Sequence, residues 1–238
     1  MVNTARASGP AELADRVRSV RERIAAAAQR SGRDPGAVTL VAVTKTRPIE
    51  TIRAALASGL RELGENRVQE LVAKSDAVPG AAMGGEVRWH VIGSLQRNKA
   101  AEVAARADLF HALDSDRLAL ELDKQARKAG RVLPCLVQVN ISGEDSKHGV
   151  AWSDLDRAVG TWSAHEHLDV VGLMGMAAPA APDEREAVVR PVFARLREAK
   201  ERLELPLLSI GMSGDFEIGV EEGATHVRVG SALFGPRG

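Results

Sequence analysis

One lysine in this sequence stands where its amine could react. The segment VAVTKTRP (residues 41–48) places Lys45 directly after an apolar, β-branched stretch and just before a turn that contains Pro48. Lysine normally holds its charge in water, so a lysine at the end of a buried strand either reaches the surface or is kept for its amine. Such an amine can form an imine with an aldehyde.

Two later segments have the composition of an anion-binding site. GMSGD (211–215) and VGSALFG (229–235) each follow an apolar stretch, and they present Ser213, Gly230 and Ser231. Glycine lets a backbone approach a phosphate closely, a serine hydroxyl donates a hydrogen bond, and a helix that begins there favours an anion. Each of these segments, taken alone, is also compatible with an ordinary turn.

Arg228 is the third candidate. In HVRVGS it alternates with Val227 and Val229, so its side chain points to the opposite face of the strand. It either forms an ion pair inside the protein or donates to a ligand atom. An amine, a phosphate cradle and an arginine together match the aldehyde, phosphate and ring nitrogen of pyridoxal 5'-phosphate. Because arginine stays cationic, it disfavours protonation of that nitrogen, which suits holding the cofactor more than carbanion chemistry.

Strand-like and helix-like segments alternate along the chain after an N-terminal helix at 10–30. Eight short apolar stretches bounded by turn residues are predicted as strands, at 38–45, 60–66, 87–94, 108–114, 133–140, 168–176, 205–213 and 225–235. Eight such units in 238 residues predict a single α/β domain, a (β/α)8 or TIM barrel over residues 1–238. An open doubly wound sheet is the rival, but TKTRP is not the glycine fingerprint of that fold.

The predicted barrel would bring the candidate residues together. Functional side chains of this fold lie at the carboxyl ends of the strands, and the loops after the seventh and eighth strands bind phosphate. Lys45 ends the first predicted strand, Ser213 ends the seventh, and Gly230 lies in the eighth. We therefore expect the amine and the two anion-binding segments to face one site.

The composition sets limits on partners and location. Basic and acidic residues number 32 each, so the formal net charge is zero, and we expect no nucleic-acid partner and no anionic membrane. No apolar run approaches the roughly 20 residues of a membrane span, and no signal peptide is recognisable. The one cysteine, Cys135, is assigned to the core. Because one cysteine cannot form an internal disulfide, a cytoplasmic location is expected.

Several segments match one protein family in their order and spacing: AVTKTRP, ELGENRVQEL, WHVIGSLQRNK, LVQVNISGEDSKHG, VVGLMGM and LSIGMSGDFEIGVEEGATHVRVGSALFG. They resemble the pyridoxal phosphate homeostasis proteins, and the resemblance covers residues 38–234. It implies a pyridoxal-phosphate-binding barrel like the N-terminal domain of alanine racemase. It assigns cofactor binding to Lys45, Asn66, Met174, Ser213, Arg228, Gly230 and Ser231.

The resemblance also implies a role for each of these residues. Lys45 would bond the cofactor as an imine, Arg228 would meet its ring nitrogen, and Met174 would pack near its ring. The two serines and the glycine would hold the phosphate, and Asn66 would lie beside the cofactor. Two positions depart from the family: Ser231 stands where many members have threonine, and His148 replaces a residue that is usually small. The second departure leaves the role of that loop open.

The function that the resemblance implies is intracellular buffering of pyridoxal phosphate and its delivery to apo-enzymes, by a monomer without clear catalytic turnover. Alanine racemase uses a tyrosine as second base, and this sequence has no tyrosine, so that mechanism is not expected. Two alternatives stay open. One is a low-turnover pyridoxal-phosphate-dependent racemase or related enzyme with Lys45 as its base. The other is a Schiff-base aldolase that takes a phosphorylated sugar without any cofactor.

The histidines are interpreted as structural. His90 in RWHVIG fits a strand histidine with satisfied hydrogen bonds better than a general base, and His111 and His226 are interpreted in the same way. His165 and His167 have no cysteine or carboxylate at ligand spacing, so no metal site is predicted.

Overall fold

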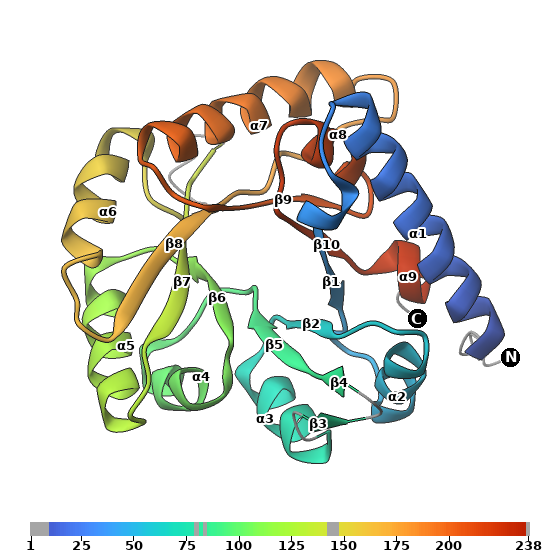
Figure 1. Ribbon diagram of the computed structural model, residues 1–238. Helices are drawn as coiled ribbons and strands as arrows, with labels where there is room; N and C mark the ends of the chain where they lie inside the picture. The colour runs from blue at the N-terminus through green and yellow to red at the C-terminus, as the bar shows by residue number, and fades with distance from the viewer. Residues whose placement is uncertain (1–9, 79–80, 83–84, 142–147, 237–238) are drawn as a thin grey trace, which may run out of the picture.

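The computed structural model is a closed barrel of eight parallel strands surrounded by helices (Figure 1). It describes residues 10–78, 81–82, 85–141 and 148–236. The barrel strands, in the order in which they pair around the barrel, are β1 (Thr39–Val43), β10 (His226–Val229), β9 (Leu207–Met212), β8 (Leu168–Met174), β7 (Leu133–Gln138), β6 (Leu109–Leu113), β5 (Arg88–Val91) and β2 (Glu62–Glu65). Each predicted strand contains one of these, so the predicted (β/α)8 barrel is confirmed.

The helices form the outer layer, as Figure 1 shows. They are α1 (Pro10–Arg30), α2 (Ile49–Ala57), α3 (Val68–Ala77), α4 (Ala100–Arg106), α5 (Asp116–Lys128), α6 (Leu155–Trp162), α7 (Arg185–Arg202), α8 (Phe216–Glu221) and α9 (Ser231–Phe234). A small antiparallel pair that the sequence analysis did not predict, β3 (Ala81–Ala82) and β4 (Gly85–Glu86), lies outside the barrel between α3 and β5 in the chain.

The barrel strands are short and apolar because both of their faces are buried. Val41 of β1, Phe110 of β6 and Leu136 of β7 are all fully buried between the barrel interior and the helices. In β10, the pattern HVRV is buried at all four positions, so polar side chains also enter the interior. Parallel pairing places Arg228 opposite Val41 of the first strand, which closes the barrel between its two ends in sequence.

Helix α1 begins and ends where the sequence predicts, at residues 10 and 30. Its apolar side chains Leu13, Val17, Val20 and Ile24 recur every three or four residues, and all are buried. They pack the helix against the C-terminal part of the barrel layer, next to α8 and α9 (Figure 1). The first helix thus covers the elements that follow the last two strands.

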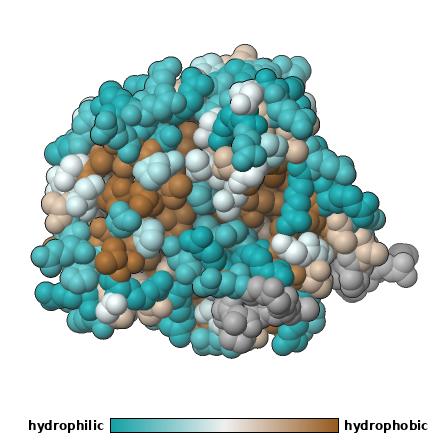
Figure 2. Space-filling view, viewed as in Figure 1, coloured by the Kyte–Doolittle hydropathy of each residue, from teal (hydrophilic) through white to brown (hydrophobic). Residues whose placement is uncertain are grey.

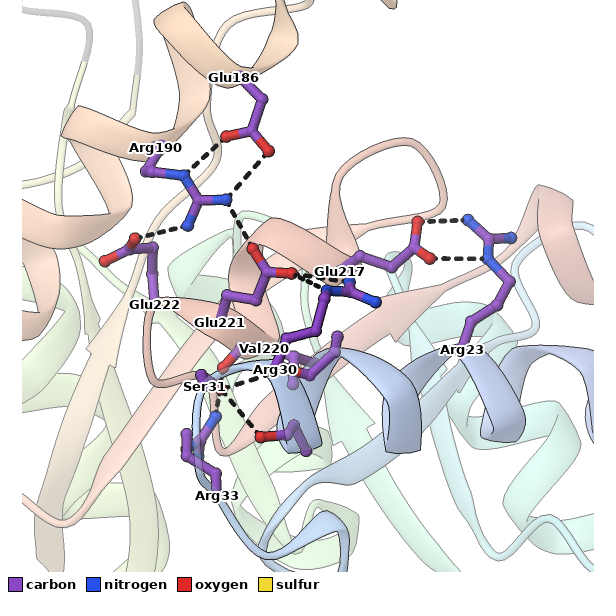
Figure 3. A network of polar contacts seen from close by, with 12 residues as sticks. Arg23, Arg30, Ser31, Arg33, Glu186, Arg190, Glu217, Val220, Glu221 and Glu222 are labelled. Carbon is purple, nitrogen blue, oxygen red and sulfur yellow. Dashed lines mark hydrogen bonds and ion pairs between the residues drawn. The ribbon is translucent and has the colours of Figure 1, made fainter.

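Ion pairs also connect α1, α7 and α8 (Figure 3). Arg23 makes two hydrogen bonds to Glu217, of 3.2 and 2.8 Å, and Arg30 approaches Glu221 to 2.7 Å. Arg190 of α7 reaches the same Glu221 at 2.6 Å. Single exposed pairs of this kind contribute little, but shared carboxylates form a network that fixes the helices relative to one another.

The surface is polar over the outer helices, with hydrophobic side chains visible between them (Figure 2). The large hydrophobic residues that are exposed include Leu120, Val132, Met176, Val188 and Met212. Scattered exposure of this kind is normal for a globular protein. None of the helices within the described ranges combines the length and the apolar character that crossing a bilayer requires.

Candidate functional site

A cavity of about 300 Å³ opens at the carboxyl ends of the barrel strands. It has the size expected of a small-molecule site. Six of the seven residues assigned to the cofactor by sequence line it, namely Lys45, Asn66, Ser213, Arg228, Gly230 and Ser231. The other lining residues are Val43, Arg47, Ile92, Met176, Met212, Gly214 and Gly235. Segments far apart in the sequence therefore converge here, as the predicted fold requires.

Lys45 lies in a tight turn directly after β1. Its side chain is half-buried, and the preceding Thr44 is fully buried. The following Thr46 has a φ of +62°, a left-handed conformation that is rare and strained for a β-branched residue. The Thr46 N–H donates to the Glu70 carboxylate at 2.6 Å. This contact holds the turn that directs Lys45 into the cavity.

A buried lysine on α3 braces the same turn. Lys74 Nζ donates to the Thr44 carbonyl oxygen at 2.8 Å, to Glu65 at 2.7 Å and to Glu70 at 2.6 Å. The Thr44 hydroxyl also donates to Glu65, at 2.6 Å. Burial raises the pKa of Glu65, although the hydrogen bonds from Lys74 and Thr44 act against that rise. The two carboxylates supply the counter-charge that the buried Lys74 ammonium needs, whereas Glu65 Oε2 is buried without a hydrogen-bond partner among the described residues.

Two turns form the wall that faces Lys45 across the cavity. The Ser213 hydroxyl oxygen accepts from the N–H of Gly230 at 3.1 Å and from the N–H of Ala232 at 3.3 Å. The Met212 N–H donates to the Asp215 carboxylate, and the Asp215 N–H donates back to the Met212 carbonyl at 3.0 Å. The loops after β9 and β10 are thereby joined into one unit. Serine hydroxyls and backbone N–H groups gather there, as an anion site requires.

Each of these turns has a glycine in it or next to it. Gly211, just before the first turn, has a φ of +90°, and a β-carbon there would lie 2.8 Å from the Cα of Phe216. Gly230 lies against Val43, whose Cβ would be 3.4 Å from a β-carbon at that position. The first glycine is needed for its backbone conformation, whereas a β-carbon at Gly230 would make only an ordinary van der Waals contact with Val43.

Arg228 lies at the floor of the cavity and is only 4% exposed. Its Nη1 donates to the carbonyl oxygen of Ser209 at 2.7 Å and to the Ser209 hydroxyl at 2.6 Å, and its Nη2 donates to the Gly175 carbonyl at 3.0 Å. Within the described residues no carboxylate forms an ion pair with it. Burial lowers the pKa of Arg228 to about 10, against the opposing charge of Asp215, so it remains a cation at neutral pH.

The comparisons with known proteins agree on one family. Residues 16–238 match the family described as alanine racemase, N-terminal domain. The chain is 40% identical to the pyridoxal phosphate homeostasis protein of Aquifex aeolicus over 229 residues, covering 94% of this chain and 97% of that one. It is 38% identical to the protein of the same name from Escherichia coli over 228 residues, covering 95% and 97%. The chain belongs to the pyridoxal phosphate homeostasis proteins.

Solved structures agree with this family and with the barrel. PipY of Synechococcus elongatus, solved with PLP bound, is 34% identical with a TM-score of 0.80, covering 94% of this chain and all of that one. Alanine racemase from Streptomyces lavendulae is 21% identical with a TM-score of 0.68, covering 94% of this chain and 58% of that one. The second likeness concerns the fold alone.

Met174 and His148 are not among the residues that line the cavity. Met174 is fully buried at the end of β8 and does not line the cavity, whereas Met176 lines it and is 45% exposed. His148 is exposed, and its Nδ1 lies 3.7 Å from the Asp114 carboxylate. Lys147, which the sequence places in the same loop, lies outside the described residues.

Sequence reasoning missed several lining residues that carry no strong motif. Arg47 is the most polar of them, and its Nη2 donates to the carbonyl of Gly235 at 2.7 Å. Its position two residues after Lys45 was the available signal. The described residues contain no group of three or more histidine, cysteine, aspartate or glutamate side chains that could hold an ion.

Proposed function

We propose that this protein binds pyridoxal 5'-phosphate in the cavity, holds it covalently on Lys45, and releases it to apo-enzymes as part of intracellular cofactor homeostasis. The observation that carries the proposal is that Lys45, Arg228 and the Ser213–Gly230 turns line one cavity of about 300 Å³. The names of the curated relatives and the structure of PipY with PLP bound support pyridoxal phosphate as the ligand.

The residues of the cavity fit the three functional groups of this cofactor. The cofactor supplies an aldehyde and an aromatic ring that can act as an electron sink. The neutral amine of Lys45 would attack the aldehyde carbon, and loss of water would complete the bond. Ser213, Gly230 and Ser231 would hold the phosphate with hydroxyl and backbone donors. Arg228 would donate to the ring nitrogen and keep it unprotonated, because a cation beside that nitrogen opposes a second positive charge.

The side chains that line the cavity favour cofactor binding rather than catalysis. Among the described lining residues, the ionisable side chains are Lys45, Arg47 and Arg228. Arginine does not act as a base at neutral pH, so Lys45 is the one proton acceptor among those side chains. A racemase needs a base on each face of its substrate, and the unprotonated ring would stabilise a carbanion poorly. A storage and delivery role therefore fits these side chains better than racemisation.

The remaining features are part of the same proposal. We expect the protein to act as one domain over residues 1–238, as a monomer in the cytoplasm. Because the formal net charge is zero, we expect no polyanionic partner such as a nucleic acid. Burial raises the pKa of the Cys135 thiol, which is fully buried, so this thiol is poorly reactive.

An absorption spectrum of the full-length protein tests the proposal. With pyridoxal phosphate added, the protein is expected to show an absorption band at about 420 nm. The Lys45→Ala variant is expected to lack this band. Lys128→Ala, an exposed lysine of α5 far from the cavity, is the matched control and should retain the band. A band that persists in Lys45→Ala contradicts the anchoring role. Steady exchange of the α-hydrogen of added amino acids with deuterated water would instead favour the racemase-type enzyme.

A further inference from the structure

A continuous chain of hydrogen bonds crosses the barrel interior from the floor of the cavity. Arg228 Nη1 lies 2.6 Å from Ser209 Oγ, and Ser209 Oγ lies 2.9 Å from His111 Nδ1. His111 Nε2 lies 2.8 Å from His90 Nδ1, and His90 Nε2 lies 2.6 Å from Glu62 Oε2. Because Glu62 is the first residue of its strand, the chain ends at the end of the barrel opposite the cavity.

The chain is a buried, isolated path. Its four inner side chains come from four different strands and are at most 4% exposed, whereas the Glu62 side chain is 23% exposed. The charged and titratable groups that face it are Arg88, 3.9 Å from Glu62, the His226 ring, about 6 Å from both other histidine rings, and Asp215 beside the arginine. Burial lowers the pKa of His226 to about 4, and that of His111 falls well below its usual value for the same reason.

The donor and acceptor capacities of these groups allow one arrangement with neutral imidazoles and an ionised Glu62. A carboxylate only accepts, so His90 must carry its proton on Nε2 and accept at Nδ1. His111 then donates from Nε2 and accepts at Nδ1 from the Ser209 hydroxyl. The Ser209 oxygen in turn accepts from Arg228. Every hydrogen bond in the chain is therefore donated in one direction, away from the cavity and toward Glu62.

This direction stabilises the buried guanidinium. Each imidazole presents its unprotonated nitrogen toward Arg228 and its N–H toward Glu62, so the dipoles favour both terminal charges. The chain takes the place of an adjacent carboxylate, which would occupy the guanidinium. Among the described residues, three of its five N–H groups donate to Ser209 and Gly175, so the other two would be available to a ligand in the cavity.

We propose that Ser209, His111, His90 and Glu62 are positioning residues for Arg228, and that their one-directional chain fixes the guanidinium toward the cofactor from the opposite end of the barrel. The proposal rests on the proposed binding of pyridoxal phosphate and extends it to four residues that do not line the cavity. Cutting the chain at Ser209 isolates Arg228 from Glu62. Neutralising Glu62 weakens the chain from its far end.

The orientation of the chain is tested first without any cofactor. Nitrogen-15 NMR of histidine-labelled full-length protein at neutral pH reports which ring nitrogen of each histidine carries the proton. We expect His90 and His111 to be neutral and protonated on Nε2. A proton on Nδ1 of either ring, alone or together with one on Nε2, overturns the one-directional chain.

The action on the cofactor is tested by a double-mutant cycle. In the full-length protein, Glu62→Gln keeps an acceptor for His90 but removes the charge, and we expect it to raise the Kd for pyridoxal phosphate about threefold to tenfold. In a Ser209→Ala background the same change should have no effect, since the chain is already cut. Ser209→Thr keeps the hydroxyl and should preserve the sensitivity to Glu62→Gln.

The matched control is Asp169→Asn, which removes an exposed negative charge near the same end of the barrel, on β8, without touching the chain. We expect it to leave the Kd unchanged. Equal effects of Glu62→Gln in both backgrounds, no effect in either, or an equal effect of Asp169→Asn would overturn the positioning role. Absence of the absorption band from unaltered protein would instead show that the proposed cofactor binding fails, and the NMR result would still decide the orientation of the chain.

Discussion

At the residue scale, the backbone of Asn66 passes so close to Gly93 that only glycine fits. A β-carbon at Gly93 would lie 2.6 Å from the Asn66 carbonyl oxygen and 3.0 Å from its Cα. Neither contact can be relieved by rotating a flexible side chain, because both partners are backbone atoms. Glycine at position 93 therefore allows the Asn66 backbone to take its place beside the cavity.

Gly93→Ala should accordingly lower the free energy of unfolding by about 1–3 kcal/mol, the usual cost of forcing an atom into a packed site. Urea unfolding measures this. Gly160→Ala in α6 is the matched control, because a β-carbon there meets no atom within 4 Å. The control should raise the free energy of unfolding by about 0.5–1 kcal/mol, since alanine favours a helix. An alanine at position 93 that leaves stability unchanged would contradict the close approach.

The candidate residues that sequence could predict are those fixed by strand ends. Lys45 and Arg228 follow from a strand boundary and from alternation within a strand, and both line the cavity. Met174 was assigned to the cofactor, but Met176 lines the cavity instead. Residues 174 and 176 share one face of a strand, so the pattern cannot tell which lies beyond the end of β8.

At the scale of elements, the turn after β1 depends on α3. Lys74 on that helix contacts the Thr44 carbonyl and two carboxylates, and the Glu65 carboxylate is fully buried. Without the ammonium group, a buried carboxylate would lose its counter-charge. The strained turn at Thr46 would also lose support, because the Glu70 carboxylate accepts hydrogen bonds from both the Thr46 N–H and the Lys74 ammonium.

Lys74→Met is expected to lower the free energy of unfolding by about 3–5 kcal/mol, the cost of leaving one partner of a buried ion pair alone. Chemical denaturation monitored by circular dichroism provides the measurement. Lys128→Met, at an exposed position of α5, should change the free energy by no more than about 0.5 kcal/mol. If the two variants unfold alike, Lys74 does not brace the turn.

Sequence predicts elements better than it predicts contacts between them. Most of the barrel strands are short apolar stretches bounded by turn residues, and they alternate with helical segments, so their existence and parallel order could be predicted. The weakest pattern is that of β2, whose sequence ELGE has two glutamates and no β-branched residue. The β3–β4 pair escaped because its few residues are mostly alanine and glycine, which carry no strand pattern. The hydrogen bond between His111 and Ser209 joins residues 98 positions apart, and neither local sequence pattern predicts it.

At the scale of the whole molecule, the barrel interior is polar enough to make stability depend on pH. Burial lowers the pKa of His226 from 6.5 to about 4, so the folded protein resists a proton that the unfolded chain accepts. Between these two values the unfolded state binds more protons, and stability therefore falls as the pH falls. His226 alone accounts for about 3 kcal/mol once the pH is below its folded pKa.

We therefore expect the free energy of unfolding to decrease as the pH is lowered from about 6.5 toward 4, beyond what carboxylate titration causes. Urea unfolding at several pH values measures the slope. His226→Gln removes the titrating ring and should give a shallower decrease than the unaltered protein. Identical slopes in the two proteins would show that His226 is protonated as readily in the folded state as in the unfolded chain.

The central claim is that Lys45 is the residue that bonds the cofactor. Reduction of the pyridoxal-phosphate-loaded protein with borohydride makes the carbon–nitrogen bond permanent, and mass analysis of the peptides then locates it. The account predicts the mass of the reduced cofactor on the peptide that contains Lys45. The same mass on a different lysine, or on no peptide at all, would contradict it.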